Sequence, residues 1–239
     1  MMVAAFAEMA ERHGESIKAF VANGCPPVLG VHRGGRHAGC YARNNQILRA
    51  LEESRDIKSV ILMSRYAQYV DDDEIVGESG EALDLPTRRA VFERQLNLTV
   101  RRLIAAGKRV ILVYPTPEIG FSVPPTLSRL VVMGRDPASF NLPRADFHAR
   151  EKIVFSILDG VDASPQLVRI WPHKRLCDSV RCLIVADGKA LYRDEDHLSR
   201  AGANLLMPEF EPIFAGPDLP AASAEVTSAL ATSAGSPGQ

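Results

Sequence analysis

Short apolar runs alternate with longer amphipathic segments along most of the chain. Apolar side chains recur at the spacing of one helix face in five segments: 2–13, 44–54, 86–106, 143–158 and 198–214. A continuous apolar run, which is typical of a buried parallel strand, occupies 59–63, and two further runs rich in apolar residues, 109–114 and 167–171, also predict strands. A shorter β-prone run at 17–21 predicts one more strand, and residues 118–142 are interpreted as mostly loop.

This alternation predicts an α/β fold in which a mostly parallel sheet carries helices on both faces. Functional side chains of such sheets gather in the loops beyond the carboxyl ends of the strands. Those loops are 23–27, 64–69 and 115–118 in this chain. We expect residues 1–214 to form one domain. Residues 215–239 are rich in Pro, Ala, Ser and Gly and hold no aromatic residue, which predicts a disordered tail.

The overall composition narrows the class of protein without identifying it. The 239 residues are 46% hydrophobic and 24% charged, which suits one globular core. The formal net charge of −1 indicates no basic surface for nucleic acid, so nucleic acid is excluded as the main partner. No apolar run reaches the length of about 18 residues that predicts a transmembrane helix, and residues 1–9 lack the features of a signal peptide.

Four cysteines fall into two local pairs, Cys25 with Cys40 and Cys177 with Cys182. Both pairs lie in loop-like sequence, and two local disulfides are the simplest of the three possible pairings. Disulfides would place the domain in an oxidising compartment. Two alternatives stay open. One is a zinc site that also uses nearby histidines, although the cysteine spacing is not that of a zinc knuckle, and the other is four reduced, unrelated thiols.

An acid and a histidine stand three residues apart at the start of the last predicted helix, as Asp194 and His197. At this spacing, a carboxylate and an imidazole on one turn can both reach a single site. A histidine so placed can act as a general base toward a serine hydroxyl if another group fixes its tautomer and orientation. The turn is therefore the strongest candidate for catalytic chemistry, provided that it meets the loops at the carboxyl ends of the strands.

Several motifs follow one another in a specific order. They are Cys25-Pro26-Pro27, Cys40, Arg65 and Tyr69 after an apolar strand, Gly107-Lys108-Arg109-Val110-Ile111-Leu112-Val113 with Pro115 and Pro117, Cys177 with Cys182, and Leu191-Tyr192-Arg193-Asp194 with His197-Leu198-Ser199 and Gly202-Ala203. Over most of residues 1–214 the chain thereby resembles the SGNH hydrolase-like domain at the carboxyl end of acyltransferase-three membrane proteins. Those proteins are bacterial O-acetyltransferases that modify surface polysaccharides.

The resemblance implies a flavodoxin-like, three-layer fold and a serine nucleophile assisted by His197 and Asp194. The serine would take an acyl group, usually acetyl, from a donor and pass it to a sugar hydroxyl through a covalent intermediate. Arg65 is the candidate side chain for holding the oxyanion, and Gly24 could lend a backbone N–H. Tyr69 could line the groove for the acceptor sugar. Each of these residues also has a purely structural interpretation. Arg65 could pair with the acidic loop that follows it, Gly24 could only form a turn, and Tyr69 could only pack against its neighbours.

The chain departs from the resemblance at the nucleophile. The Gly-Asp-Ser-His block that carries the family's serine is absent from residues 1–239. If residues 1–14 are the first helix, we expect that block to lie just upstream of Met1. One alternative is a natural pseudoenzyme that binds polysaccharide without catalysis. Another is a stand-in serine, for which the chain offers Ser16, Ser64, Ser122, Ser128 and Ser199.

The resemblance also implies partners and a location. The expected partners are an acyl donor, a carbohydrate acceptor on a cell-surface polysaccharide or lipopolysaccharide, and a membrane acyltransferase domain that is fused upstream or separate. No cofactor and no metal are expected. The domain would be periplasmic or otherwise extracytoplasmic, tethered to the inner membrane through upstream segments. A fragment of a free-standing carbohydrate esterase is a further alternative.

Overall fold

A three-stranded parallel sheet lies at the centre of the computed structural model, which describes residues 2–71 and 74–214. Its strands, in the order β2-β4-β6, are Ser59–Leu62, Arg109–Val113 and Leu167–Ile170. In their register Val60 lies opposite Val110, and Val110 lies opposite Leu167. The three runs predicted to be strands are thus the three strands of this sheet.

The central strand β4 is apolar on both faces of the sheet. Val110 and Leu112 belong to one hydrophobic core, and Ile111 and Val113 belong to the other. All of these side chains are fully buried, because successive residues of a strand point to opposite faces. A strand buried on both faces reads as a continuous apolar run rather than an alternating one, which explains the pattern in the sequence.

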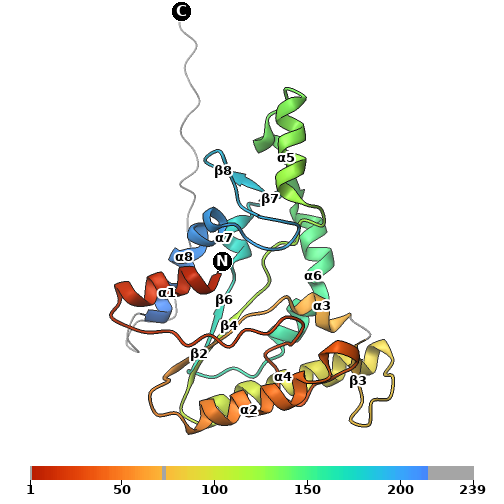
Figure 1. Cartoon of the computed structure of the whole chain (residues 1–239), viewed down its shortest axis with the longest axis vertical. Helices are drawn as coiled ribbons and strands as arrows, with labels where there is room; N and C mark the ends of the chain where they lie inside the picture. The colour runs from red at the N-terminus through yellow and green to blue at the C-terminus, as the bar shows by residue number, and fades with distance from the viewer. Residues whose placement is uncertain (1, 72–73, 215–239) are drawn as a thin grey trace, which may run out of the picture.

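Helices cover both faces of the sheet (Figure 1). The core that contains Leu112 is completed by α2 (Cys40–Glu53), α4 (Leu85–Ala105) and α6 (Arg144–Asp159). The core that contains Ile111 is completed by α1 (Met2–Arg12), α7 (His173–Leu176) and α8 (Arg200–Phe214). The helices α1 and α8 lie side by side, with the rings of Phe6 and Phe210 edge to face at 4.7 Å. The predicted α/β architecture, with helices on both faces, is confirmed.

Two predictions about individual elements are wrong. Residues 17–21 form no strand and pair with no strand in the described ranges; Phe20 and Val21 are exposed instead. Residues 118–142, expected to be mostly loop, contain the helix α5 (Val123–Val132). Its prolines at 124 and 125 lie in the first turn, where a missing N–H costs no hydrogen bond and the fixed φ suits the helix.

The remaining elements are short. They are α3 (Tyr66–Val70), the 3-10 turns η1 (Gly35–His37) and η2 (Pro137–Ser139), and three antiparallel pairs: β1 (His32–Arg33) with β3 (Ile75–Val76), β5 (Asn141–Pro143) with β7 (Arg181–Leu183), and β8 (Val185–Ala186) with β9 (Lys189–Ala190). Part of the acidic loop, residues 72–73, and the predicted tail at 215–239 lie outside the described residues. Among the helices of residues 2–71 and 74–214, none combines the length and the apolar character needed to cross a bilayer.

Both local cysteine pairs are disulfides. Cys25 is joined to Cys40 across 15 positions, and Cys177 is joined to Cys182 across 5. The described residues therefore include no free cysteine, and the alternatives of a zinc site and of reduced thiols do not hold in this structure.

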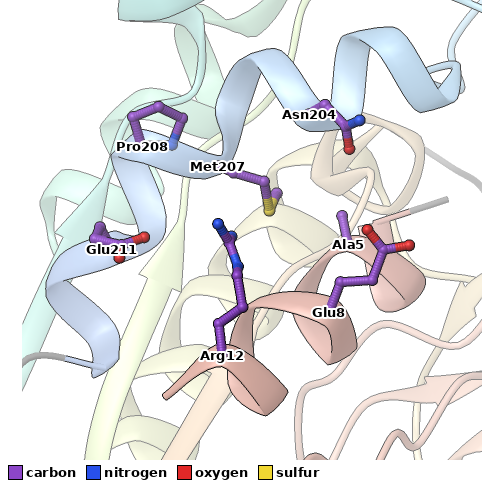
Figure 2. Close-up of a pocket in the computed structure, with 7 residues that line it drawn as sticks. All are labelled: Ala5, Glu8, Arg12, Asn204, Met207, Pro208 and Glu211. Carbon is purple, nitrogen blue, oxygen red and sulfur yellow. The ribbon is translucent and has the colours of Figure 1, made fainter.

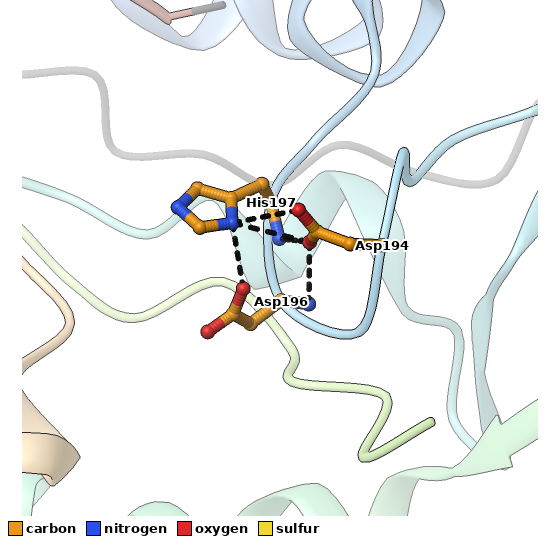
Figure 3. A group of neighbouring side chains, drawn as sticks. All are labelled: Asp194, Asp196 and His197. Carbon is orange, nitrogen blue, oxygen red and sulfur yellow. Dashed lines mark hydrogen bonds and ion pairs between the residues drawn. The ribbon is translucent and has the colours of Figure 1, made fainter. Parts of the chain in front are cut away.

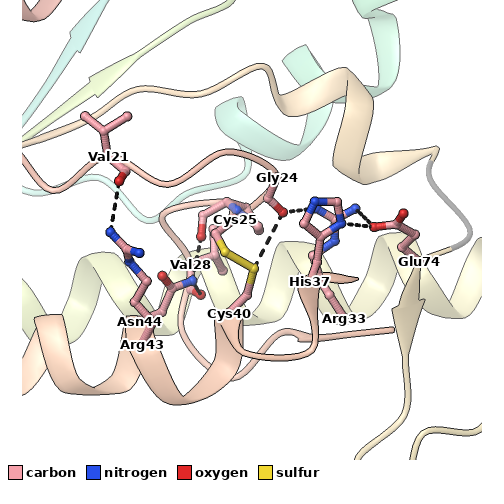
Figure 4. The surroundings of a disulfide bond; sticks show 11 residues. Val21, Gly24, Cys25, Val28, Arg33, His37, Cys40, Arg43, Asn44 and Glu74 are labelled. Carbon is pink, nitrogen blue, oxygen red and sulfur yellow. Dashed lines mark hydrogen bonds and ion pairs between the residues drawn. A yellow bond between two sulfur atoms is a disulfide. The ribbon is translucent and has the colours of Figure 1, made fainter. Parts of the chain in front are cut away.

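The first disulfide holds an irregular segment against a helix (Figure 4). Cys40 is the first residue of α2, and Asn44 lies one turn further along. The amide of Asn44 donates hydrogen bonds to the carbonyl groups of Pro26 at 2.7 Å and Val28 at 3.0 Å. The disulfide and these two bonds together fix the segment that precedes β1.

Candidate active site

The turn that contains Asp194 and His197 meets the carboxyl ends of β2 and β4. The backbone N–H of Ile119, beyond the end of β4, donates to the carbonyl of Glu195 at 2.7 Å. Arg65, which follows β2, forms an ion pair with Asp196. These contacts confirm that the turn joins the loops that leave two strands of the sheet.

The Asp194 carboxylate folds the turn. Its Oδ1 accepts the backbone N–H of His197 at 2.7 Å and that of Asp196 at 3.1 Å, an arrangement that Asp readily makes with the residues after it. The N–H of Arg193 donates to the carbonyl of His197 at 2.9 Å and closes the turn. Asp194 is therefore a structural residue of the turn as well as a neighbour of the imidazole.

The His197 imidazole is held through one ring nitrogen (Figure 3). Its Nδ1 lies 2.8 Å from Asp196 Oδ1 and 3.0 Å from Asp194 Oδ2. Its Nε2 points away from both carboxylates and has no hydrogen-bond partner in the described part of the chain, and the side chain is 61% exposed. An imidazole anchored at Nδ1 and open at Nε2 can accept a proton from a hydroxyl group.

The helix that follows is fixed to the turn by Ser199 and Gly202. The Ser199 hydroxyl donates to the carbonyl of Ala190 at 2.6 Å and accepts the N–H of Gly202 at 3.1 Å, which is an N-cap arrangement at the start of α8. Gly202 lies so close to the carbonyl oxygen of Leu191 that a Cβ would overlap with it. Because its hydroxyl is occupied, Ser199 is unsuited to be a stand-in nucleophile.

Asp194 and Asp196 differ in how readily they ionise. Partial burial opposes ionisation of Asp194, but the N–H groups of His197 and Asp196 and the imidazole outweigh it and hold the pKa of Asp194 below its ordinary value. Burial raises the pKa of Asp196, and the charges of Arg65 and His197 offset that effect only in part. Asp194 is thus the carboxylate that stays ionised over the wider range of pH.

Arg65 is engaged in ion pairs through three of its nitrogens. Its Nε and Nη2 donate to the two oxygens of Glu118 at 2.7 and 2.8 Å, which is a bidentate pair. Its Nη1 contacts Asp196. Glu118 is also paired with Arg150 of α6. A chain of alternating charges therefore runs from α6 across the end of the sheet to the turn.

Sequence reasoning missed Glu118, Arg150 and Glu151. Glu118 lies in the loop that leaves β4, and this position is the signal that could have identified it. Arg150 and Glu151 lie within α6, where no local pattern distinguishes them. Glu151 is 1% exposed, and neither of its carboxylate oxygens has a hydrogen-bond partner among the described residues. Burial and the charge of Glu118 raise the pKa of Glu151 to about 7.

Other residues singled out from the sequence lie away from the turn. Gly24 has a φ of 71° and lies beside the first disulfide, where its carbonyl accepts a hydrogen bond from Arg33 (Figure 4). Tyr69 is 5% exposed, with its ring 5.0 Å from the same guanidinium. Asp71, of the acidic loop, pairs with Arg89 at 2.6 Å rather than with the arginine after β2. Gly24 and Tyr69 thus both contact Arg33, and their roles toward substrate stay predictions.

Two further features bear on ligand binding. The donor atoms of Asp194, Asp196 and His197 lie within 4.8 Å of one another, but these groups already pair with one another, so the cluster alone does not indicate a metal. The expectation of no metal and no cofactor stays a prediction.

An open groove of about 840 Å³ lies between α1 and α8 (Figure 2), lined by Ala5, Glu8, Arg12, Asn204, Met207, Pro208 and Glu211. Its lining includes no histidine, cysteine or serine.

Comparison with known proteins identifies the family. Residues 1–212 match the family described as the SGNH domain fused to AT3 domains. The chain belongs to this family. The SGNH domain is also similar to the periplasmic domain of a lipopolysaccharide acetyltransferase from Salmonella ser. Paratyphi A, with a TM-score of 0.63 and 17% identity over 89% of this chain and 78% of that one. At this identity the likeness shows the fold alone. No curated protein matches the chain.

Proposed function

We propose that this SGNH domain carries out the acyl transfer of an O-acyltransferase, with His197 as the general base and Asp194 as the carboxylate that orients it. The observation that supports this most is the His197 imidazole, anchored at Nδ1 and open at Nε2. Membership of a family whose SGNH domains are fused to AT3 acyltransferase domains adds support. Acetyl is the proposed acyl group, because the similar Salmonella protein is an acetyltransferase.

The reaction proceeds in two halves that share one base. In the first, a serine oxygen attacks the acyl carbonyl carbon while His197 Nε2 accepts the serine proton, and Asp194 stabilises the imidazolium. The tetrahedral intermediate collapses, the imidazolium gives its proton to the leaving group, and the acyl group remains on the serine. In the second half, Nε2 takes the proton of a sugar hydroxyl, whose oxygen attacks the acyl-serine. That proton then passes to the departing serine oxygen.

The serine itself is not identified among residues 1–239. They contain no Gly-Asp-Ser sequence, and the hydroxyl of Ser199 is engaged with Ala190 and Gly202. We infer that the nucleophile belongs to a segment outside these residues, which packs where His197 Nε2 is open; Ser16, Ser64, Ser122 and Ser128 are the alternatives within them. A polysaccharide-binding domain without catalytic activity is the alternative.

The proposed partners follow from the family and the neighbouring structure. A membrane acyltransferase domain delivers the acyl group, and the acceptor is a sugar of a surface polysaccharide or lipopolysaccharide. Two disulfides suit an oxidising compartment, and the similar Salmonella domain is periplasmic. The domain therefore works on the extracytoplasmic side of the membrane, held there by its acyltransferase partner.

The O-acetyl content of the cell-surface polysaccharide tests this proposal. The full polypeptide that contains the domain is expressed unchanged, as His197→Gln and as Asp194→Asn. We expect both substitutions to lower ester transfer by about 100-fold or more, because each removes or misorients the general base. His13→Gln is the matched control, since His13 pairs with Glu211 away from the turn, and it leaves transfer unchanged.

Two results would count against the proposal. Full transfer by the His197→Gln protein would remove this histidine from the mechanism. An unchanged protein that binds the polysaccharide but forms no ester would support the inactive, carbohydrate-binding alternative.

A further inference from the structure

We propose that Arg65 is a positioning residue that holds Asp196 as a second carboxylate against His197. This inference rests on the proposed function and extends it. It gives the guanidinium group a different role from direct contact with an oxyanion.

The guanidinium group of Arg65 contacts a carboxylate on each of two sides. Nε and Nη2 bond to Glu118 at 2.7 and 2.8 Å, and Nη1 contacts Asp196. The Glu118 side chain is 7% exposed and that of Arg65 is 41% exposed, so the carboxylate of this bidentate pair is largely shielded from water. To contact an oxyanion through Nε or Nη2, Arg65 would have to give up this bidentate pair and leave the nearly buried Glu118 carboxylate to Arg150 alone, which is costly.

Asp196 connects Arg65 to the imidazole through its two oxygens. Oδ2 pairs with Arg65, and Oδ1 lies 2.8 Å from His197 Nδ1. Asp194 is slightly further from that nitrogen and hydrogen-bonds to it through both oxygens, at 3.0 Å for Oδ2 and 3.1 Å for Oδ1, and its Oδ1 also accepts the N–H groups of the turn. Asp194 therefore folds the turn and orients the ring, whereas Asp196 connects the ring to a fixed cation.

Asp196 needs this cation in order to act on the ring. Burial and the charge of Asp194 favour the protonated form of Asp196, whereas Arg65 and His197 favour the ionised form. Only the ionised form stabilises an imidazolium. Arg65 thus supplies a positive charge that is present in both protonation states of the histidine.

Glu118 fixes Arg65 to a rigid part of the fold. It follows Pro115 and Pro117 at the end of β4 and is held from the other side by Arg150 of α6. Arg193 adds a third guanidinium group to this cluster, with its Nε 3.5 Å from Asp194 Oδ2.

Carbon-13 NMR titration of the Asp196 carboxyl group tests the inference on residues 1–239, without a nucleophile or a substrate. Arg65→Met removes the cation, so we expect the titration midpoint of Asp196 to rise by about 1 pH unit. Arg65→Gln gives the same expected rise and decides the question if the methionine variant does not fold. Arg101→Met is the control, because it also removes one positive charge. The Arg101 side chain is 61% exposed, and its Nη1 lies 4.0 Å from Oδ2 of its ion-pair partner Asp162.

An unchanged Asp196 midpoint in a folded Arg65 variant would overturn the inference. A rise in the Arg101→Met control equal to that in the Arg65 variants would overturn it as well, because the effect would then reflect net charge alone.

Kinetics of the full polypeptide separate positioning from contact with the oxyanion. If Arg65 acts through Asp196, Arg65→Met lowers kcat for acyl transfer by about 10-fold with little change in KM and adds no further loss to Asp196→Asn. Losses that multiply in the double variant would mean that Arg65 acts on the reacting atoms directly. If the polypeptide transfers no acyl group at all, the proposed function fails, and the carboxyl titration still decides the role of Arg65 toward Asp196.

Discussion

The histidines of this domain differ in what surrounds their ring nitrogens. His173 is 6% exposed and packs against the rings of Phe147 and Phe155. Burial lowers the pKa of His173 to about 4, and its Nδ1 has no hydrogen-bond partner within the described residues. His173 is therefore a neutral core residue. His197 combines an anchored nitrogen with an open one at the surface, which is the combination that a general base requires.

Glu151 makes the stability of the fold depend on pH. Its pKa is raised from an ordinary value of 4.5 to about 7, so the folded state prefers the protonated form. The stability gained from this preference is present below the ordinary pKa and is lost as the pH rises through 7. We expect Glu151→Gln to be more stable than the unchanged protein at pH 8 by about 2–3 kcal/mol and equally stable at pH 4.

Urea unfolding at the two pH values measures this difference. Glu53→Gln is the matched control, because Glu53 is exposed at the end of α2, and it changes the free energy of unfolding little at either pH. A Glu151→Gln variant with the same stability difference at both pH values would show that this carboxylate does not titrate as described.

The start of α8 determines where the turn with Asp194 and His197 lies. Ser199 caps the helix, and Gly202 packs directly on the backbone oxygen of Leu191. We expect Gly202→Ala to lower the free energy of unfolding by about 2–3 kcal/mol, because the added methyl group must push the helix away from the segment that leads into the turn. Chemical denaturation of the purified domain measures the loss.

Gly39→Ala is the control for this substitution. Gly39 precedes α2 with a φ of −74°, and a Cβ there would meet nothing within 4 Å. Its change in stability should stay within about 0.5 kcal/mol. Equal effects of the two substitutions would contradict the close approach between Gly202 and Leu191.

At the scale of the whole molecule, local patterns in the sequence predicted the sheet and the pairing of Asp194 with His197 on one turn. The apolar run at 109–113 became a strand buried on both faces, and Asp194 and His197 came together because three residues of spacing place them on one turn. The run at 17–21 failed as a strand because β-propensity acts only where a neighbouring strand provides hydrogen bonds and packing.

The charged network around the turn could not be predicted in the same way. Arg65 and Glu118 are 53 positions apart, and Glu118 and Arg150 are 32 apart. Their meeting depends on the order of β2 and β4 in the sheet and on the packing of α6, which no local pattern encodes. The sequence therefore indicated Arg65 as a candidate functional residue without indicating Glu118 and Asp196 as its partners.

The rate at which a fluorophosphonate probe labels a serine of the full polypeptide tests the central claim most directly, because it requires neither the acyl donor nor the sugar. The account predicts one labelled serine, outside residues 1–239, whose labelling slows by about 100-fold in His197→Gln and is unchanged in His13→Gln. Labelling at the same rate in the unchanged and His197→Gln proteins would contradict the assignment of His197 as the base that activates the nucleophile.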